Sequence, residues 1–555
     1  MIKKLACTLA FALPLAMAQS TANSPSEIEQ LKQMLLDQQK QINELKIRLG
    51  MAVNRALGEV ASTKPMVPAT ASEPASTFSN WAPPAGTSSG SASQINQNPR
   101  PDEPGPLQLK LGDAYFTPIG FMDMTSVTRS TNPGSGIGTN FGSIPYSNTQ
   151  AGALSESRFS VQNSRIGLKV DTMFHDYKVT GWWESDFLGQ LGSPPNGGLA
   201  VSSNPYVFRL RLFWVDVQKG HSEFLAGQTW SLMTPGKTGI SPIPNDIFYS
   251  QDVDVNYQAG LVWGRIPEFR YVYHASDKVH FALALDNSEP YVGGANGGSG
   301  VTLPAAISTT ATTGSTQGSV LGGQINNGSS VISSAALMPD IIAKLAFDPT
   351  NKFHIEFAGV MIANKIAYPM TGPTFPTNTD VGGGGSVNLN FELAKGFRIY
   401  TNNYWSDGGG RYIFGQAPDF MIRANGTASL IHSGSTVSGF EYITPKNTFY
   451  AYYGGVYIAK NMALDANGTT KIGYGSISSD GQNRAIQEFT VGTNTTLAKS
   501  PSWGALNLMM QYSYLQRDPW LVTGTAPTNA SLSMGFVNLR YTLPLYSAWS
   551  RLGKN

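Results

Sequence analysis

The chain has 555 residues, of which 13% are charged, 11% are aromatic and 59 are glycine. Soluble domains carry about 25% charged residues, so an ordinary soluble enzyme or binding domain is not expected. The formal net charge is +2, which argues against a nucleic-acid partner, because proteins that bind nucleic acid are normally basic.

The first residues have the pattern of a secretory signal peptide. Two lysines precede an apolar run over residues 5–15, and an Ala-x-Ala cleavage site ends at Ala18. The run is too short to cross a bilayer as a helix, which takes about 20 residues. We expect residues 1–18 to be removed. Cleavage also removes the only cysteine, Cys7, and leaves an exported chain without disulfides.

Residues 24–50 predict a periplasmic coiled-coil helix, with Ser24 as its N-cap and Gly50 as its stop. Apolar side chains recur at alternating steps of three and four, which are the a and d positions of heptads: Ile28, Leu31, Leu35, Ile42, Leu45 and Leu49. Such a seam must be covered, and self-association is favoured over docking on another protein. The heptads alone do not fix the number of helices.

Residues 51–106 are rich in Pro, Ser and Ala and predict a disordered linker. Residues 86–90 match the G-x-S-x-G nucleophile pattern. That pattern has meaning only between a strand and a helix, and the linker offers neither, so we reject it.

From residue 107 to residue 555 the apolar period becomes two, as in residues 279–285 and 537–543. No mature segment has the unbroken apolar stretch of a membrane helix. This pattern predicts an all-β transmembrane antiparallel barrel, since a soluble β-sandwich has a polar face richer in charge. Aromatic clusters such as Phe449, Tyr450, Tyr452 and Tyr453 are assigned to its interfacial girdles.

The connections alternate between short turns and long polar loops, as bacterial barrels require. We place the short turns near residues 174–176, 219–220, 275–277, 348–351, 395–396, 445–447 and 500–502. The count is about 16 strands with both ends in the periplasm, or 18 if residues 257–264 form a strand of their own and the longest loop, residues 287–336, holds another. A barrel of this size leaves an aqueous lumen.

Four segments of the barrel resemble the DcaP-like porins: Ser164-Arg165-Ile166-Gly167-Leu168-Lys169-Val170, Trp183-Glu184-Ser185-Asp186-Phe187-Leu188-Gly189, Leu210-Arg211-Leu212-Phe213-Trp214-Val215-Asp216 and Gly227-Gln228-Thr229-Trp230-Ser231. The likeness covers residues 158–274. It implies a 16-stranded trimeric porin with a periplasmic N-terminal coiled coil and small anionic solutes. One feature departs from outer-membrane barrels, which usually end on an aromatic residue that closes the last strand. This chain continues to Asn555, so its assembly signal is internal or atypical.

Parity assigns a set of basic side chains to the pore lining: Arg165, Lys169, Lys178, Arg209, Arg211, Arg270, Lys278 and Arg540. The acidic side chains on the same faces include Glu184, Asp186 and Glu356. Rings of Arg and Lys favour anions. The alternative is that these charges only solvate the lumen and pair across it.

Residues 232–255 are the best candidate for a loop that folds inward and narrows the pore, an assignment made by analogy with porins in general. Its charged residues are Lys237, Asp246, Asp252 and Asp254. An ordinary surface loop is nearly as good an interpretation.

The sequence therefore predicts an outer-membrane porin for passive diffusion of small polar, preferentially anionic solutes. We expect a homotrimer surrounded by outer-membrane lipid, with no cofactor, no metal, no catalytic residue and no nucleic acid. The six histidines are scattered, and no H-E-x-x-H or C-x-x-C motif is present. Two alternatives stay open. The first is a structural protein whose coiled coil contacts the cell wall, and the second is a barrel enzyme using the pair His354 and Glu356.

Overall fold

The computed structural model describes residues 33, 40, 96–97, 107–189, 207–247, 252–253, 258–306, 324–326, 333–367, 376–414, 417–475 and 480–546. By internal contacts the chain divides into Met1–Ala82 and Pro83–Asn555. Of the first unit only Gln33 and Lys40 are described, both helical. The signal peptide, the apolar seam of the heptads and most of the linker lie outside the described residues.

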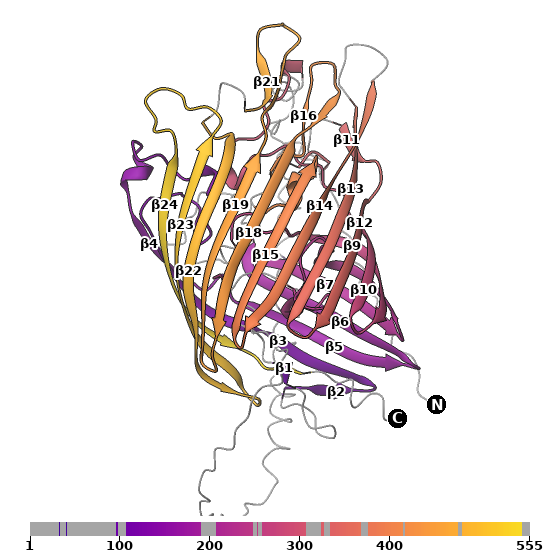
Figure 1. Ribbon diagram of the computed structural model, residues 1–555. Helices are drawn as coiled ribbons and strands as arrows, with labels where there is room; N and C mark the ends of the chain where they lie inside the picture. The colour runs from indigo at the N-terminus through magenta and orange to yellow at the C-terminus, as the bar shows by residue number, and fades with distance from the viewer. Residues whose placement is uncertain are drawn as a thin grey trace, which may run out of the picture. The chain divides into compact units, whose positions relative to one another are not determined.

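The second unit contains a closed antiparallel β-barrel (Figure 1). Its wall has 16 strand positions, which confirms the favoured count. These are β3 (Ala114–Arg129), β5 (Arg165–Phe174), β6 (Tyr177–Gly189), β7 (Val207–Lys219), β8 (Ser222–Trp230), β9 (Arg265–Ser276), β10 (Val279–Asp286), β12 (Asp340–Thr350), β13 (Phe353–Ala367), β14 (Thr377–Ala394), β15 (Phe397–Asp407), β18 (His432–Ile443), β19 (Asn447–Ile458), β22 (Asn483–Ser500), β23 (Gly504–Pro519) and β24 (Ala530–Thr542).

Three short strands extend these positions. They are β2 (Leu109–Leu111), β4 (Glu156–Ser160) and β11 (Ser333–Ala336), which pair with β3, β3 and β13. The sheet closes where β24 pairs with β3, from Met534 opposite Arg129 to Thr542 opposite Phe121. Closure leaves no strand edge unpaired in the wall, which is the condition for a sheet to cross a bilayer.

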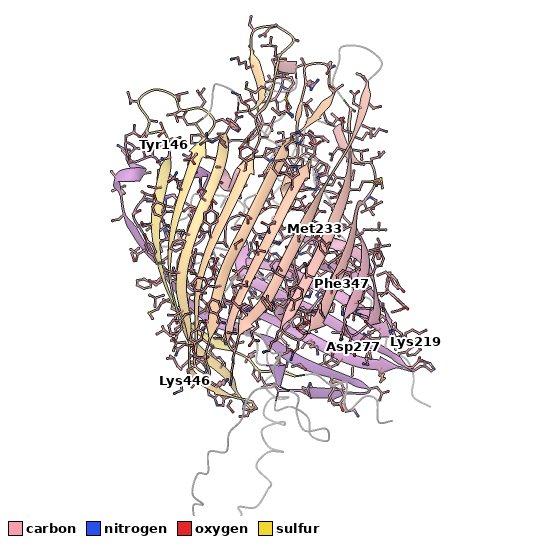
Figure 2. The ribbon with its side chains drawn as sticks, in the orientation of Figure 1. Tyr146, Lys219, Met233, Asp277, Phe347 and Lys446 are labelled. Carbon is pink, nitrogen blue, oxygen red and sulfur yellow. The ribbon has the colours of Figure 1, made fainter. Side chains whose placement is uncertain are left out.

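The seven predicted short turns are confirmed. Figure 2 shows Lys219, Asp277 and Lys446, which lie at or beside three of them, at one end of the barrel, and Tyr146 of a long connection at the other. Two turns use glycine in the left-handed region, Gly220 at φ 57° and Gly396 at φ 74°, which side chains with a Cβ rarely adopt. The turns follow from local sequence, so they fix which residues of each hairpin face one another.

Proline inside a barrel strand normally removes a ladder hydrogen bond. Pro267 of β9 avoids this loss because β10 ends at Asp286, which pairs with Glu268. The carbonyl of Pro267 accepts from the backbone of Asn287 instead. Of residues 256–274, those described supply loop over 258–264 and the single strand β9 from Arg265. The closed wall has 16 strand positions, so the alternative of 18 strands is wrong.

The alternation of apolar and polar side chains follows the wall. On β24, Val537 and Leu539 are exposed, while Asn538 and Arg540 are buried inside. Val279, Phe281, Leu283 and Leu285 on β10, and Met510, Tyr512 and Tyr514 on β23, lie on the outer face in the same way. The predicted apolar outer face is confirmed. No helix of the described residues is long and apolar enough to span a membrane.

Tyr450 and Tyr452 do not belong to the outer girdle to which the sequence assigned them. They are buried inside the barrel, and only their neighbours Phe449 and Tyr453 are exposed. The cause is the period of two, which sends consecutive aromatic residues to opposite faces.

The chain does not end with the last wall strand. After Thr542 the backbone N–H of Leu543 donates to the carbonyl of Gly120. Strand β25 (Leu545–Tyr546) then pairs in parallel with β1 (Asn96–Gln97) from the predicted linker. The strand that closes the barrel thus ends on Thr542, in keeping with the departure noted in the sequence.

Candidate channel interior

A group of basic side chains lines the interior over β5, β6 and β7, and each has an acidic neighbour. Arg211 donates to Glu184 and to Asp186, both at 2.8 Å. Arg209 makes a two-point contact with Asp186 at 2.6 and 3.0 Å, and Lys169 lies 2.8 Å from Asp171. The arginine pairs join β6 to β7, and the pair Lys169–Asp171 lies within β5, so the positive charge is neutralised locally to a large extent.

Phe121 on β3 connects this group to β24. The guanidinium of Arg540 lies 4.0 Å and that of Arg165 4.9 Å from the centre of its ring. Both cations gain from the negative face of the ring. Arg540 also donates to Asp123 at 2.6 Å, and Arg165 lies 3.5 Å from Glu184.

Three predicted lining residues lie elsewhere. Arg270 is buried on β9, pairs with Glu268 and donates to the carbonyl of Trp230 at 2.6 Å. Lys178 and Lys278 are exposed. Lys278 lies in the turn between β9 and β10, and Lys178 lies next to the turn that precedes β6. The two lysines sit at the rim because the strands end there, so neither lines the interior.

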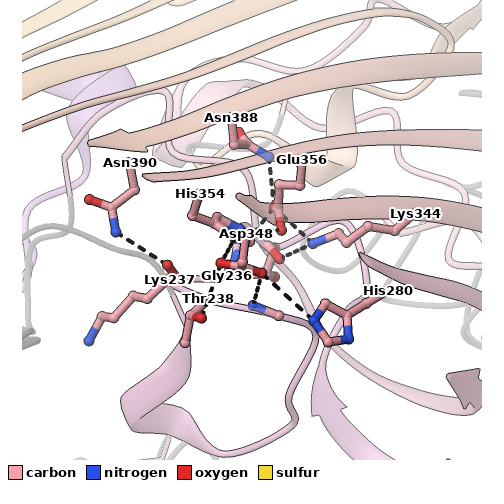
Figure 3. Close-up of polar contacts among 12 residues, drawn as sticks. Gly236, Lys237, Thr238, His280, Lys344, Asp348, His354, Glu356, Asn388 and Asn390 are labelled. Atoms are coloured by element: carbon pink, nitrogen blue, oxygen red, sulfur yellow. Dashed lines mark hydrogen bonds and ion pairs between the residues drawn. The ribbon is translucent and has the colours of Figure 1, made fainter. Parts of the chain in front are cut away.

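The connection between β8 and β9, residues 231–264, is called loop L3 below. Its described residues, 231–247, 252–253 and 258–264, lie inside the barrel. On one side L3 contacts β12, β13 and β14 (Figure 3). Lys344 donates to the carbonyl of Thr234 at 2.7 Å, and the backbone N–H of Gly236 donates to Glu356 at 3.2 Å. Asn390 donates to the carbonyl of Lys237 at 3.3 Å.

On the other side L3 contacts β15, β22 and β23. The backbone N–H groups of Val253 and Ala259 donate to Gln511 and Glu488, both at 2.8 Å. That of Val262 donates to Asn402 at 3.4 Å. Although β14 and β15 are neighbours, β12 and β23 are seven strand positions apart in the wall of 16, so the described part of L3 crosses the interior.

Of the charged residues of L3, Lys237 is buried and Asp246 is half-buried. Burial lowers the pKa of Lys237 to about 8, and the cation of Arg398 acts in the same direction. Burial raises the pKa of Asp246, which accepts from Ser241 at 2.9 Å. Asp252 is buried, and Asp254 lies outside the described residues.

Two further connections enter the interior, which the sequence did not predict. Arg411, between β15 and β18, donates to Asp419 at 2.8 Å, to Asp340 at 2.6 Å and to Ser288 at 3.2 Å. Ser288 belongs to the connection between β10 and β12, so the arginine joins two connections and the wall. Burial raises the pKa of Asp419 to about 6 despite its arginine partner. The only signal in the sequence is the glycine run before Arg411.

The connection between β15 and β18 also contacts L3. The backbone N–H of Trp263 donates to Tyr412 at 2.9 Å, and that of Phe414 to Leu261 at 2.7 Å. The rings of Trp263 and Phe414 stack at 5.7 Å. L3 is therefore held both by strands of the wall and by the connection between β15 and β18. Its position depends on both sets of contacts.

The histidines are less scattered than the sequence suggested. His274, His280 and His354 lie together on β9, β10 and β13 with Glu223, Asp348 and Glu356. Among the described residues no group of three or more His, Cys, Asp or Glu side chains has the geometry to hold a metal ion.

No family model matches the sequence, and no characterised relative matches it either. The fold is similar to the outer-membrane channel DcaP of Acinetobacter baumannii, with a TM-score of 0.54, 14% identity, and coverage of 78% of this chain and 99% of that one. An anion-selective porin of Comamonas acidovorans has a TM-score of 0.40 and 10% identity over 78% of this chain and 100% of that one. OmpF of Salmonella typhi has a TM-score of 0.39 and 10% identity over 79% and 100%. The first comparison establishes a porin-like barrel fold.

Proposed function

We propose that this protein is an outer-membrane porin through which small polar solutes diffuse passively. The observation that carries the proposal is the closed wall of 16 strands, with exposed apolar side chains outside and ionised and amide side chains inside. A barrel of this size is wide enough for an aqueous path. L3, which crosses the interior, is the constriction that solutes pass, with Lys237, Asp246, Asp252 and Asp254 as its charged residues.

The proposed preference is for anions. Over β24, β5, β6 and β7 with the facing part of β3, the inward-facing charges balance: Arg165, Lys169, Arg209, Arg211 and Arg540 against Asp123, Asp171, Glu184, Asp186 and Asp216. Four of the five cations are arginines, whose planar fork of N–H groups matches the geometry of a carboxylate. Because the numbers of positive and negative charges are equal, the preference is mild.

The remaining parts of the proposal concern export and assembly. The signal peptide directs the chain to the periplasm, and the coiled coil of residues 24–50 holds three barrels together as a homotrimer. The alternative in which the coiled coil contacts the cell wall uses the same segment. Deleting residues 25–50 separates the two, because only the first predicts dissociation to monomers.

The experiment is a conductance measurement on the purified mature chain in a planar bilayer. We expect discrete steps of current and, under a salt gradient, a reversal potential with the sign of a mildly anion-selective pore. A protein that inserts as a folded barrel and passes no current contradicts the porin. A hydrolase assay on lipids and esters, in which the barrel enzyme predicts turnover that depends on His354, tests the other alternative.

A further inference from the structure

Ionisable side chains form a continuous row across five strands of the inner wall. Nε2 of His274 lies 3.0 Å from Glu223, and its Nδ1 lies 2.8 Å from Nδ1 of His280. Nε2 of His280 lies 3.8 Å from Oδ2 of Asp348. His354 continues the row, with Nδ1 at 2.9 Å from Asp348.

The row ends on residues 236–239 of L3, called the tip of L3 below (Figure 3). Oδ2 of Asp348 accepts from the backbone N–H of Gly239 at 2.8 Å, and Oδ1 accepts from the hydroxyl of Thr238 at 3.1 Å. Glu356, which lies 3.3 Å from the other nitrogen of His354, accepts from Gly236. The same two carboxylates thus hold the histidines and the loop.

The contacts dictate where the protons are. Glu223 accepts only, so Nε2 of His274 carries a hydrogen. With His274 neutral, its Nδ1 is a lone pair that accepts from Nδ1–H of His280. This leaves Nε2 of His280 as a lone pair facing the carboxylate of Asp348, which explains why these two atoms stay at 3.8 Å.

We propose that protonation of the His274–His280 pair releases the tip of L3 from the wall, so that acid changes the width of the pore. One proton added to the neutral pair has two possible places. On Nδ1 of His274 it makes two N–H groups face each other, and on Nε2 of His280 it creates a new donor. That donor competes with the Gly239 N–H for Oδ2 of Asp348, the atom that anchors the loop. The inference rests on the proposed function, because it makes L3 the constriction of a conducting pore.

The other charged groups around the row do not oppose this direction. Lys344 holds Glu356 at 3.0 Å. Protonation of Asp348 or Glu356 at still lower pH removes acceptors from the same loop, so it acts with the histidines. The remaining ionisable neighbours are the carboxyl groups of Asp216, Asp277 and Glu268 and the cations of Arg270 on β9 and Lys237 on L3. The uncharged polar neighbours are the backbone carbonyl of Asp277 and the amides of Asn388 and Asn390 on β14.

The test follows L3 and the current separately in the mature chain. Hydrogen exchange of peptides covering residues 232–247 is measured at about pH 7.5 and about pH 5.5, the range in which imidazoles titrate, and corrected for intrinsic exchange. We expect the released fraction to rise by up to about tenfold per pH unit. The single-channel conductance should change over the same range.

The variants are His280→Gln and, as a second route, His274→Gln, which hydrogen-bond but do not titrate. We expect both to lose the acid response of exchange and of conductance. His432→Gln is the matched control, because this side chain is exposed and pairs with Asp407 away from the row. It should respond as the unmodified protein does.

Two results overturn the proposal: unchanged protection of residues 232–247 in acid, or a full acid response in folded His280→Gln or His274→Gln. If one variant does not fold, the other decides. A barrel that passes no current at either pH contradicts the porin function, while the exchange experiment still decides whether the histidine pair controls the loop.

Discussion

The guanidinium of Arg411 lies 2.6 Å from the carboxylate of Asp340, and both side chains are buried. Asp340 begins β12, whereas Arg411 belongs to the connection between β15 and β18, so this ion pair joins the wall to a segment in the interior. Asp419 is the second carboxylate of the arginine, at 2.8 Å. Two buried anions thus depend on one cation.

Arg411→Ala should destabilise the barrel strongly, because it leaves both carboxylates buried without their partner. Breaking a buried ion pair from one side costs about 3–5 kcal/mol. We expect a lower midpoint of chemical unfolding and a noisier, larger conductance, since L3 loses its support from Tyr412 and Phe414. Arg423→Ala is the control, because this arginine is exposed in the same connection and donates to the hydroxyl of Ser429 rather than to a carboxylate.

Val537→Arg should impair the membrane-inserted barrel. Val537 lies on β24, is half exposed on the outer face and pairs with Ser126 and Met510. An arginine on the lipid face of a barrel costs about 2–4 kcal/mol at the middle of the bilayer and about 0–1 near its surface. Unfolding from lipid vesicles by denaturant measures the difference.

The matched control for Val537 is Ser531→Arg, on the same face near the outer end of the same strand. We expect a much smaller loss there. Equal losses at the two positions would mean that the outer face of β24 does not meet lipid at the depth its place in the strand suggests.

The barrel could be predicted from the sequence because its determinants are local. A period of two sets the face of each side chain, and glycines such as Gly220 and Gly396 set the hairpins. Given the hairpin between β9 and β10, even the meeting of His274 with His280 follows from the register, although the bulge after Val279 shifts it by one residue. The prediction that the histidines are scattered came from their spacing along the chain. Spacing along the chain does not show which residues of neighbouring strands lie opposite each other.

The interior could not be predicted in the same way. The connections that carry Ser288 and Arg411 are long and rich in glycine, so no periodicity tells which of their side chains turns inward. The partners of Arg411 come from three separate parts of the chain. Tyr450 and Tyr452 show a different error. Their aromatic character was used to place them on the outer face, although their even-numbered positions on the strand send them inside.

Arg209→Gln should weaken the proposed anion preference. Its side chain is 37% exposed, whereas Arg211 stays buried beside Asp186 and keeps that carboxylate paired. Charge is screened within about 8 Å in physiological salt, so we expect a change in the permeability ratio of no more than about two-fold. Reversal potentials under a salt gradient give the ratio, and Lys278→Gln at the rim should change it less. A shift toward anions in Arg209→Gln would contradict this assignment.

Lys237 should make the selectivity depend on pH. Burial and the nearby Arg398 lower its pKa to about 8, so the ammonium is charged below that value and neutral above it. If L3 is the constriction, anion preference is complete below about pH 7 and declines as the pH rises through about 8. The measurement is the reversal potential as a function of pH, with Lys237→Met as the variant that should show the low preference at every pH. An unmodified protein whose selectivity stays constant from about pH 6 to about pH 10 would place the solute path away from Lys237, because no other change in L3 cancels the loss of this charge.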